Sequence, residues 1–214
     1  EDSTIGNVTR LVFDLIGYKK VCNETGAKPV YLDEDKAQSV VLESGKSVKV
    51  PKTIATIAEH RNTVTYIDLA KLKSHNATVV TLGMKNQYGF LSHVDRMGNH
   101  DENIHSIIVD LYEYIKPDFT IIDGIEAVSG EMPVLAFEDR LIRKLDILIG
   151  GTDTVAADVV GTKILGYQTD QVPHLKIAQE RRLGETNLDA ITILGSSLDS
   201  FGGKSDWNIV DEFP

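Results

Sequence analysis

The sequence predicts an α/β fold with a mainly parallel central sheet, helices on both faces and a small hairpin at one edge. Short, continuous apolar runs, typical of strands buried on both faces, alternate with segments of helical periodicity. The chain has 214 residues and 42% hydrophobic content, which is enough for one sizeable core. We therefore expect residues 1–195 to form a single domain and residues 196–214 to be a C-terminal surface tail.

Helices are predicted where apolar residues recur at helical spacing. Gly17 is expected to interrupt the first helix and Gly26 to end it, Pro51 to start the second and Pro117 to follow the third. The five predicted helical segments are residues 8–26, 51–59, 104–115, 154–165 and 172–182.

Strands are predicted where β-branched and apolar residues form short runs. A hairpin of residues 39–42 and 47–50 is expected to turn at Ser44-Gly45. The other predicted strands are residues 29–32, 63–69, 119–122, 145–149 and 190–194. We expect the last four of these to share one sheet.

Composition excludes several classes of function. The net charge of −10 argues against nonspecific nucleic-acid binding. Cys22 is the only cysteine, so the chain can hold neither an intrachain disulfide nor a cysteine-ligated iron–sulfur cluster. The sequence has no apolar run long enough to span a membrane. We expect a cytoplasmic protein, although a chain that opens at Glu1 leaves open a removed leader; its oligomeric state is also open.

A cluster of cations is the most informative feature of the chain. Lys71, Lys73 and His75 follow a predicted strand, and Lys85-Asn86 lies shortly after them. Ligands of open α/β sheets bind beyond the carboxyl ends of the strands. We therefore predict that Lys73, Lys85 and Asn86 bind a small anion, with Lys85 and His75 as catalytic residues and His75 as general base. The alternatives are a solvated strand end and a structural histidine.

Acidic residues follow two other predicted strands. Gly151, Thr152 and Asp153 join a strand to a helix and could bind the ligand at the helix N-terminus, although Asp153 could simply cap that helix. Asp123 and Asp158 could hold a divalent cation through their oxygens. The turn at Gly124 explains Asp123 nearly as well, and Asp158 could instead pair with a lysine.

Three further histidines, His93, His100 and His105, fit no strong metal-binding pattern. We predict instead that residues 89–103 form a mobile lid, from which His93 meets the ligand.

These residues, taken in order, resemble the family called domain of unknown function 362. The matching segments are Lys73-Ser74-His75, Lys85 to Gly89, Asp118 to Gly124, Asp153 to Asp158 and Ile193-Leu194-Gly195. The resemblance implies an α/β fold that brings these motifs together, and implies little about a reaction. The family's early Lys-Pro-Asn strand is missing, so we expect this chain to lack the first strand.

Some members of that family carry ferredoxin-type cysteine clusters, which suggests redox chemistry in those proteins. Because this chain lacks such cysteines, a redox role would need a separate partner. Three functions therefore remain open. They are an enzyme acting on a small anion, a noncatalytic ligand- or metal-binding module that serves a redox protein, and a structural or interaction domain.

Overall fold

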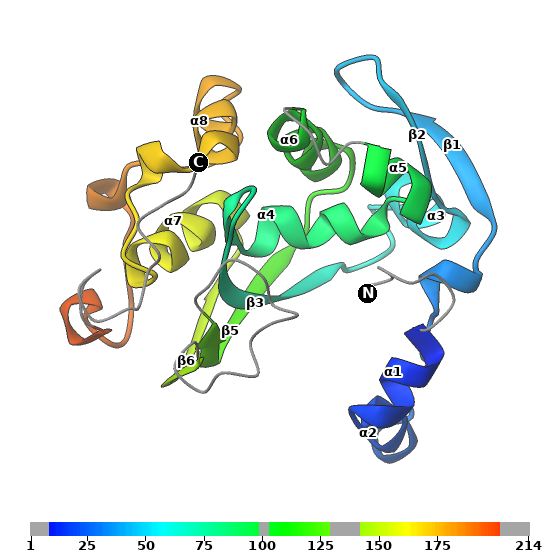
Figure 1. Ribbon diagram of the computed structural model, residues 1–214, viewed down its shortest axis with the longest axis horizontal. Coiled ribbons are helices and arrows are strands. Elements are labelled where there is room, and N and C mark those ends of the chain that lie inside the picture. Colours follow the sequence, from blue (N-terminus) through cyan, green and yellow to red (C-terminus); the bar gives the residue numbers. More distant parts are fainter. Residues whose placement is uncertain (1–8, 99–102, 129–141, 202–214) are drawn as a thin grey trace.

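The computed structural model describes residues 9–98, 103–128 and 142–201, and confirms the α/β class (Figure 1). The α-helices are α1 (Thr9–Leu15), α2 (Tyr18–Thr25), α3 (Lys52–Glu59), α4 (Gly83–Asn86), α5 (His93–Gly98), α6 (Ile104–Tyr114), α7 (Thr154–Ile164) and α8 (Pro173–Glu180). The strands are β1 (Ala37–Val41), β2 (Ser47–Pro51), β3 (Ile67–His75), β4 (Val79–Thr81), β5 (Phe119–Val128) and β6 (Ile142–Gly151). Short 3₁₀ helices are η1 (Leu32–Glu34), η2 (Gln87–Phe90), η5 (Thr169–Gln171), η6 (Leu188–Ala190) and η7 (Leu198–Phe201).

The first helical segment is divided as predicted. Gly17 has φ 88° and separates α1 from α2, and Gly26 has φ 76° and closes α2. Both values lie in the left-handed region, which glycine adopts without steric cost. The strand predicted at residues 29–32 is wrong, because the chain turns there into η1 rather than pairing with a described strand.

The predicted hairpin is confirmed, but it forms a separate sheet. β1 and β2 pair antiparallel from Ala37↔Pro51 to Val41↔Ser47, with Gly45 at φ 81° in the turn. The two strands form a two-stranded sheet of their own and are not the edge of the main sheet. Pro51 precedes α3 as expected.

The main sheet has the strand order β4-β3-β5-β6. Its central strands, β3 and β5, are parallel as predicted, starting from Ile67↔Phe119. Both edge pairs are antiparallel, with Lys73 opposite Thr81 and Thr120 opposite Gly151. A short apolar run reports that a strand is buried and carries no information about its direction, so the sequence could not reveal this difference.

The strand predicted at residues 190–194 is wrong. This stretch follows η6 and lies across a cavity of about 600 Å³ from β6. Ile191 and Ile193 line that cavity and do not pair with the free edge of β6. Beyond it, Leu198 and Phe201 pack against the hydrophobic core, so this part of the predicted tail contacts the domain.

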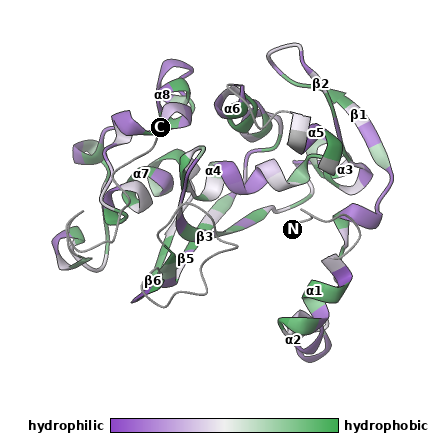
Figure 2. Cartoon of the chain, viewed as in Figure 1, coloured by the Kyte–Doolittle hydropathy of each residue, from purple (hydrophilic) through white to green (hydrophobic). Residues whose placement is uncertain are grey.

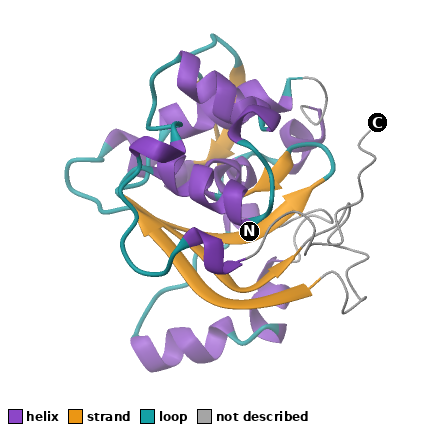
Figure 3. Cartoon of the chain, turned by 90° about the vertical axis from the view of Figure 1, so that its left-hand side faces the viewer, coloured by secondary structure: helices purple, strands orange, loops and turns teal. Residues whose placement is uncertain are grey.

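Within the described residues, the helices that pack closely on the main sheet cover one of its faces. The side chains of β3 alternate, with Ala70 and Leu72 buried and Ile67 and Leu69 exposed. On the buried side the sheet packs against α4 and α7, and most other helices lie on that side too (Figure 3). Among the described residues, α4 and α7 make the main helix contacts with this sheet, and the other face carries the exposed side chains of β3.

Candidate functional site

The short helix α4 is fixed at both ends by buried carboxylates. At its start, the N–H groups of Gly83 and Met84 donate to the two carboxylate oxygens of Asp158, at 2.8 and 2.9 Å. At its end, Asn86 Nδ2 donates to Asp68 Oδ1 at 2.7 Å and to the carbonyl of Leu69 at 3.2 Å. The sheet and α7 thus hold α4 rigidly, and with it the backbone of Lys85.

Close packing explains the glycine at the start of this helix. A Cβ on Gly83 would lie 2.7 Å from Cγ2 of Thr120 and 2.8 Å from Cγ2 of Thr154. The hydroxyl groups of those two threonines are themselves hydrogen-bonded at 2.8 Å. Only glycine lets α4 approach β5 and α7 this closely.

Lys85 is buried, with 9% of its surface exposed. Its Nζ donates to Thr81 Oγ1 at 3.2 Å. Thr81 is also the residue that faces Lys73 in the β3–β4 ladder. Lys73 alternates along β3 with the buried Leu72 and Ser74, so its side chain points to the other face of that strand.

Two histidines complete a buried polar cluster, which we define as Thr81, Lys85, His105 and His174. The rings of His105 and His174 are stacked, with centroids 5.7 Å apart. His174 is fully buried, and neither of its ring nitrogens has a hydrogen-bond partner among the described residues; the same holds for Nδ1 of His105. Buried polar atoms normally have partners, so these three nitrogens are unusual.

Both histidines are neutral at physiological pH. Burial first, and then repulsion from positive charge on His105 and Lys85, together lower the pKa of His174 to about 3. Burial and the Lys85 charge also lower the pKa of His105. A neutral imidazole offers one donor and one acceptor. The cluster can therefore present one ammonium group and several neutral donors to a ligand.

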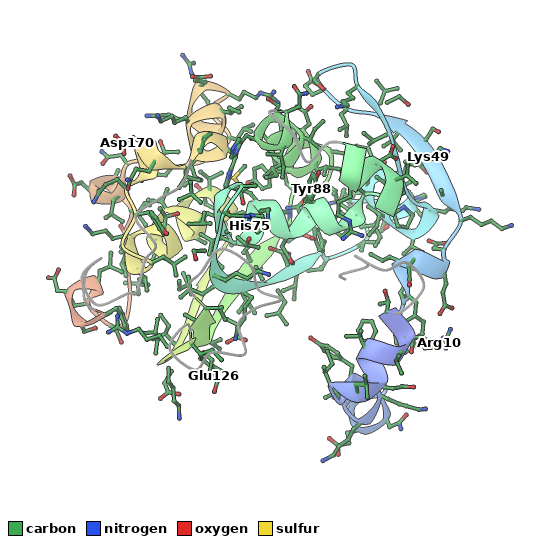
Figure 4. All side chains as sticks on the ribbon, in the orientation of Figure 1. Arg10, Lys49, His75, Tyr88, Glu126 and Asp170 are labelled. Atoms are coloured by element: carbon green, nitrogen blue, oxygen red, sulfur yellow. The ribbon has the colours of Figure 1, made fainter. Side chains whose placement is uncertain are left out.

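His75 lies at the end of β3, in the middle of the molecule (Figure 4). Its Nδ1 accepts the N–H of Ala77 at 3.1 Å, which places the proton of the neutral ring on Nε2. The side chain is half-buried. A histidine fully satisfied by backbone on both nitrogens would exclude catalysis, and the structure shows a backbone bond on one of them.

The two carboxylates predicted to share a metal do not come together. Asp123 accepts a hydrogen bond from Lys71 Nζ at 3.0 Å, on the face of β5 opposite the buried Ile122 and Gly124. Asp158 lies under α4 on the helix-covered face, where backbone N–H groups occupy both its oxygens. Among the described residues no group of three or more metal-binding side chains is present.

Asp158 and Asp68 are unusual in their protonation. Burial raises the pKa of Asp158 to about 8, against the opposing effect of its two backbone donors. Burial likewise raises the pKa of Asp68 to about 6, although the hydrogen bonds from Asn86 and Tyr66 lower it. Both carboxyl groups are hydrogen-bonded to α4, so two carboxyl groups with raised pKa values lie next to this helix.

Gly151, Thr152 and Asp153 lie apart from His75. Since β6 runs antiparallel to β5, Gly151 pairs with Thr120 near the start of β5. All three residues line the 600 Å³ cavity beside β6. Asp153 caps α7 by accepting from Ala156 N–H at 3.0 Å, and also accepts from Glu185 N–H at 2.8 Å, so its carboxylate is used by the fold.

His93 begins α5, and the position of its side chain lies outside the described part of the chain. The predicted lid is helical at residues 93–98, and residues 99–102 also lie outside the described part.

The sequence analysis missed His174 and considered His105 only as a metal ligand. One signal could have found His174. It lies next to Leu175, and four residues before Ala178, on the buried stripe of an amphipathic helix. A histidine on such a stripe must find a partner or remain neutral.

The described residues form an α/β protein with a buried lysine–histidine cluster. The chain belongs to the family described as domain of unknown function (DUF362), whose model matches residues 1–163. It is 31% identical over 125 residues to the thylakoid-associated protein sll1697 of Synechocystis sp.. The match covers 55% of this chain and 37% of that relative. No solved structure matches the chain.

Within residues 9–98, 103–128 and 142–201, none of the helices is both long and apolar enough to cross a membrane.

Proposed function

We propose that this chain binds a small anion, a carboxylate or a phosphate, at the buried polar cluster around Lys85. One observation carries the proposal. His174 is fully buried next to His105, with three ring nitrogens of the pair unpartnered in the described residues, and Lys85 acts electrostatically on both. A ligand with acceptor oxygens would accept hydrogen bonds from the protonated ring nitrogens and from Lys85.

The charge of the cluster supports an anion over a cation. Its ionisable members are one ammonium group and two neutral imidazoles, in a chain whose net charge is −10. Thr81 supplies a hydroxyl group that accepts a hydrogen bond from Lys85, and its backbone pairs with that of Lys73. A carboxylate or phosphate can accept hydrogen bonds from ammonium, hydroxyl and imidazole groups together. We therefore retain Lys73 as the second cation of the site.

In the enzymatic form of the proposal, His75 or the His105–His174 pair transfers a proton and Lys85 holds the ligand. In the noncatalytic form of the proposal, the chain binds the same ligand without converting it and serves a separate redox protein. Turnover of the bound ligand distinguishes the two. His75→Gln keeps a hydrogen-bonding side chain and removes the titrating group, so it should preserve binding and abolish turnover if His75 is the base.

The binding test has two stages. Native mass spectrometry of freshly purified protein looks for a copurified ligand or metal. Thermal unfolding is then measured with inorganic phosphate and with a panel of small carboxylates, because a ligand that binds the folded state raises the melting temperature by mass action. Lys85→Met should remove the shift, and Lys73→Met should reduce it.

Lys163→Met is the matched control, because Lys163 is an exposed lysine of α7 outside the cluster. It should leave the ligand-induced shift unchanged. Equal shifts in the wild type, Lys85→Met and Lys163→Met would disprove the site.

We propose a cytoplasmic location for this chain on its composition alone. The relative is described as thylakoid-associated, so fractionation of cells into soluble and membrane fractions is the relevant measurement.

A further inference from the structure

On the face of the main sheet opposite α4 and α7, the described residues include a patch of exposed apolar side chains. We call it the open face and define it as Ile67, Leu69, Phe119, Ile121 and Leu148. Ile67, Leu69 and Leu148 are 56%, 59% and 63% exposed. The register places them side by side, since Ile67 pairs with Phe119 and Leu69 with Ile121, and Leu148 lies on the next strand. Exposed apolar patches of this kind mark interaction sites.

The open face carries little net charge. Two ion pairs border it, Lys71 with Asp123 at 3.0 Å and Lys144 with Asp146 at 3.7 Å, and their charges balance. The ring of Phe119 lies over Gly150, where a Cβ would be 3.1 Å from its Cζ. The surface is therefore suited to another apolar surface rather than to an ion.

A second unpartnered apolar surface lies on the helical hairpin α1–α2. Leu11, Val12, Leu15 and Ile16 recur at i and i+4, so they form one side of α1, and Leu15 and Ile16 are 76% and 63% exposed. Apolar residues are visible along both helices, which project from the body of the molecule (Figures 1 and 2).

The hairpin is attached at its base and does not cover the open face of its own chain. Arg10 forms a bidentate pair with Glu34, at 2.9 and 2.6 Å, and its guanidinium lies 4.1 Å from the ring centre of Tyr31. Phe13 packs edge-on against the same tyrosine. Beyond this anchor α1 and α2 pack mainly on each other. Each chain therefore presents an apolar helix pair and an apolar sheet face that do not meet.

We infer that the α1–α2 hairpin of a second copy of this chain covers the open face, in a reciprocal two-fold dimer. Exposed apolar patches are normally buried against a partner surface, and helices are a common cover for the apolar face of a sheet. Two-fold exchange buries both apolar surfaces of both chains at once. An anionic membrane is a poorer occupant, because the chain has a net charge of −10 and binding to such surfaces depends on basic residues.

The oligomeric state tests this inference. One chain has a mass of 23.6 kDa, so light scattering after size-exclusion chromatography should report twice that value for the wild type. Leu15→Asp on the hairpin and Leu69→Asp on the open face should each give a monomer. Val41→Asp is the control, because Val41 is 68% exposed on β1, outside both surfaces, and this variant should remain a dimer. Circular dichroism checks folding, and Leu148→Asp replaces Leu69→Asp should the latter unfold.

Cross-linking then identifies the occupant. In a Cys22→Ser background, a chain with Leu15→Cys mixed with a chain carrying Leu69→Cys should form a disulfide between the two chains. Three results would overturn the inference. The first is a monomeric wild type. The second is a disulfide that forms within a single chain carrying both cysteines. The third is a monomer that floats with liposomes and no longer does so when Leu15→Asp or Leu69→Asp is introduced.

Discussion

The imidazole rings of His105 and His174 lie nearly parallel, with centroids 5.7 Å apart and an angle of 13° between their planes. Two protonated rings at this separation would repel each other, and Lys85 adds a third positive charge nearby. Protonating either ring in the folded chain is therefore unfavourable, which makes the stability of the domain depend on pH.

The first prediction concerns that dependence. The pKa of His174 is about 3 in the folded chain and near its ordinary value of 6.5 when unfolded. Between these values the unfolded chain binds a proton that the folded chain does not, so the free energy of unfolding falls as pH decreases through this range. From about pH 7 to about pH 5, His174 should remove on the order of 2 kcal/mol.

Replacing the histidine isolates this contribution. His174→Phe keeps a ring in the stack and cannot titrate, so its urea-unfolding free energy should lose less between the two pH values than that of the wild type. Burial raises the pKa of Asp158 to about 8, so Asp158 increases the free energy of unfolding as pH decreases. Its contribution is the same in both proteins, so the quantity to compare is the difference between the wild type and His174→Phe. His60→Gln, at an exposed histidine, is the control. Equal losses in His174→Phe and the wild type would contradict the assignment.

The second prediction concerns the charge of Lys85. Because this charge lowers the pKa of His105, Lys85→Met should raise that pKa, although burial should keep it below the ordinary value. Titration of the imidazole signals by NMR measures the change. Lys163→Met removes an exposed lysine of α7 and should leave the His105 titration where it is. If His105 titrates identically in both variants, Lys85 does not belong to the cluster.

The elements were predictable where local signals are strong. Gly17 and Gly26 divide and end the first helical segment, and Ser44-Gly45 marks the hairpin turn, because glycine at positive φ is a local requirement. Strand direction and the open face of the sheet were not predictable. They depend on which strands pair, and an apolar run such as Leu145–Ile149 is compatible with either direction.

The site was predictable in part. Lys85 was singled out and lies in the buried polar cluster, whereas the side chain of Lys73 points to the other face of β3 and its part in the site stays a prediction. His174 was missed because it is distant in sequence and reaches the cluster only through the packing of α8 against α6. Asp158 was recognised as unusual among apolar neighbours, but its partners are backbone N–H groups, which no sequence motif displays.

The third prediction follows from those partners. Asp158→Leu would leave the N–H groups of Gly83 and Met84 buried without acceptors, and each unsatisfied group costs about 1–3 kcal/mol. The free energy of unfolding should therefore fall by about 2–5 kcal/mol. Asp158→Asn keeps one acceptor oxygen and should lose about half as much. Chemical denaturation measures both. Asp170→Asn, at an exposed aspartate, is the control, and its free energy of unfolding should stay within about 0.5 kcal/mol of the wild type. A similarly small loss for Asp158→Leu would refute the role of Asp158 in capping α4.

The last prediction concerns Gly184, which lies against the cap of α7. A Cβ at this position would overlap Oδ1 of Asp153 and lie 2.6 Å from Cβ of Val155. That carboxylate accepts from Ala156 N–H and from Glu185 N–H, so it cannot move aside without losing hydrogen bonds. Gly184→Ala should therefore lower the free energy of unfolding by about 1–3 kcal/mol. Gly98→Ala is the matched control, since a Cβ there meets nothing within 4 Å, and it should change stability by less than about 0.5 kcal/mol. Equal melting temperatures for the two alanine variants would show that the loop at residues 184–185 gives way without disturbing the cap.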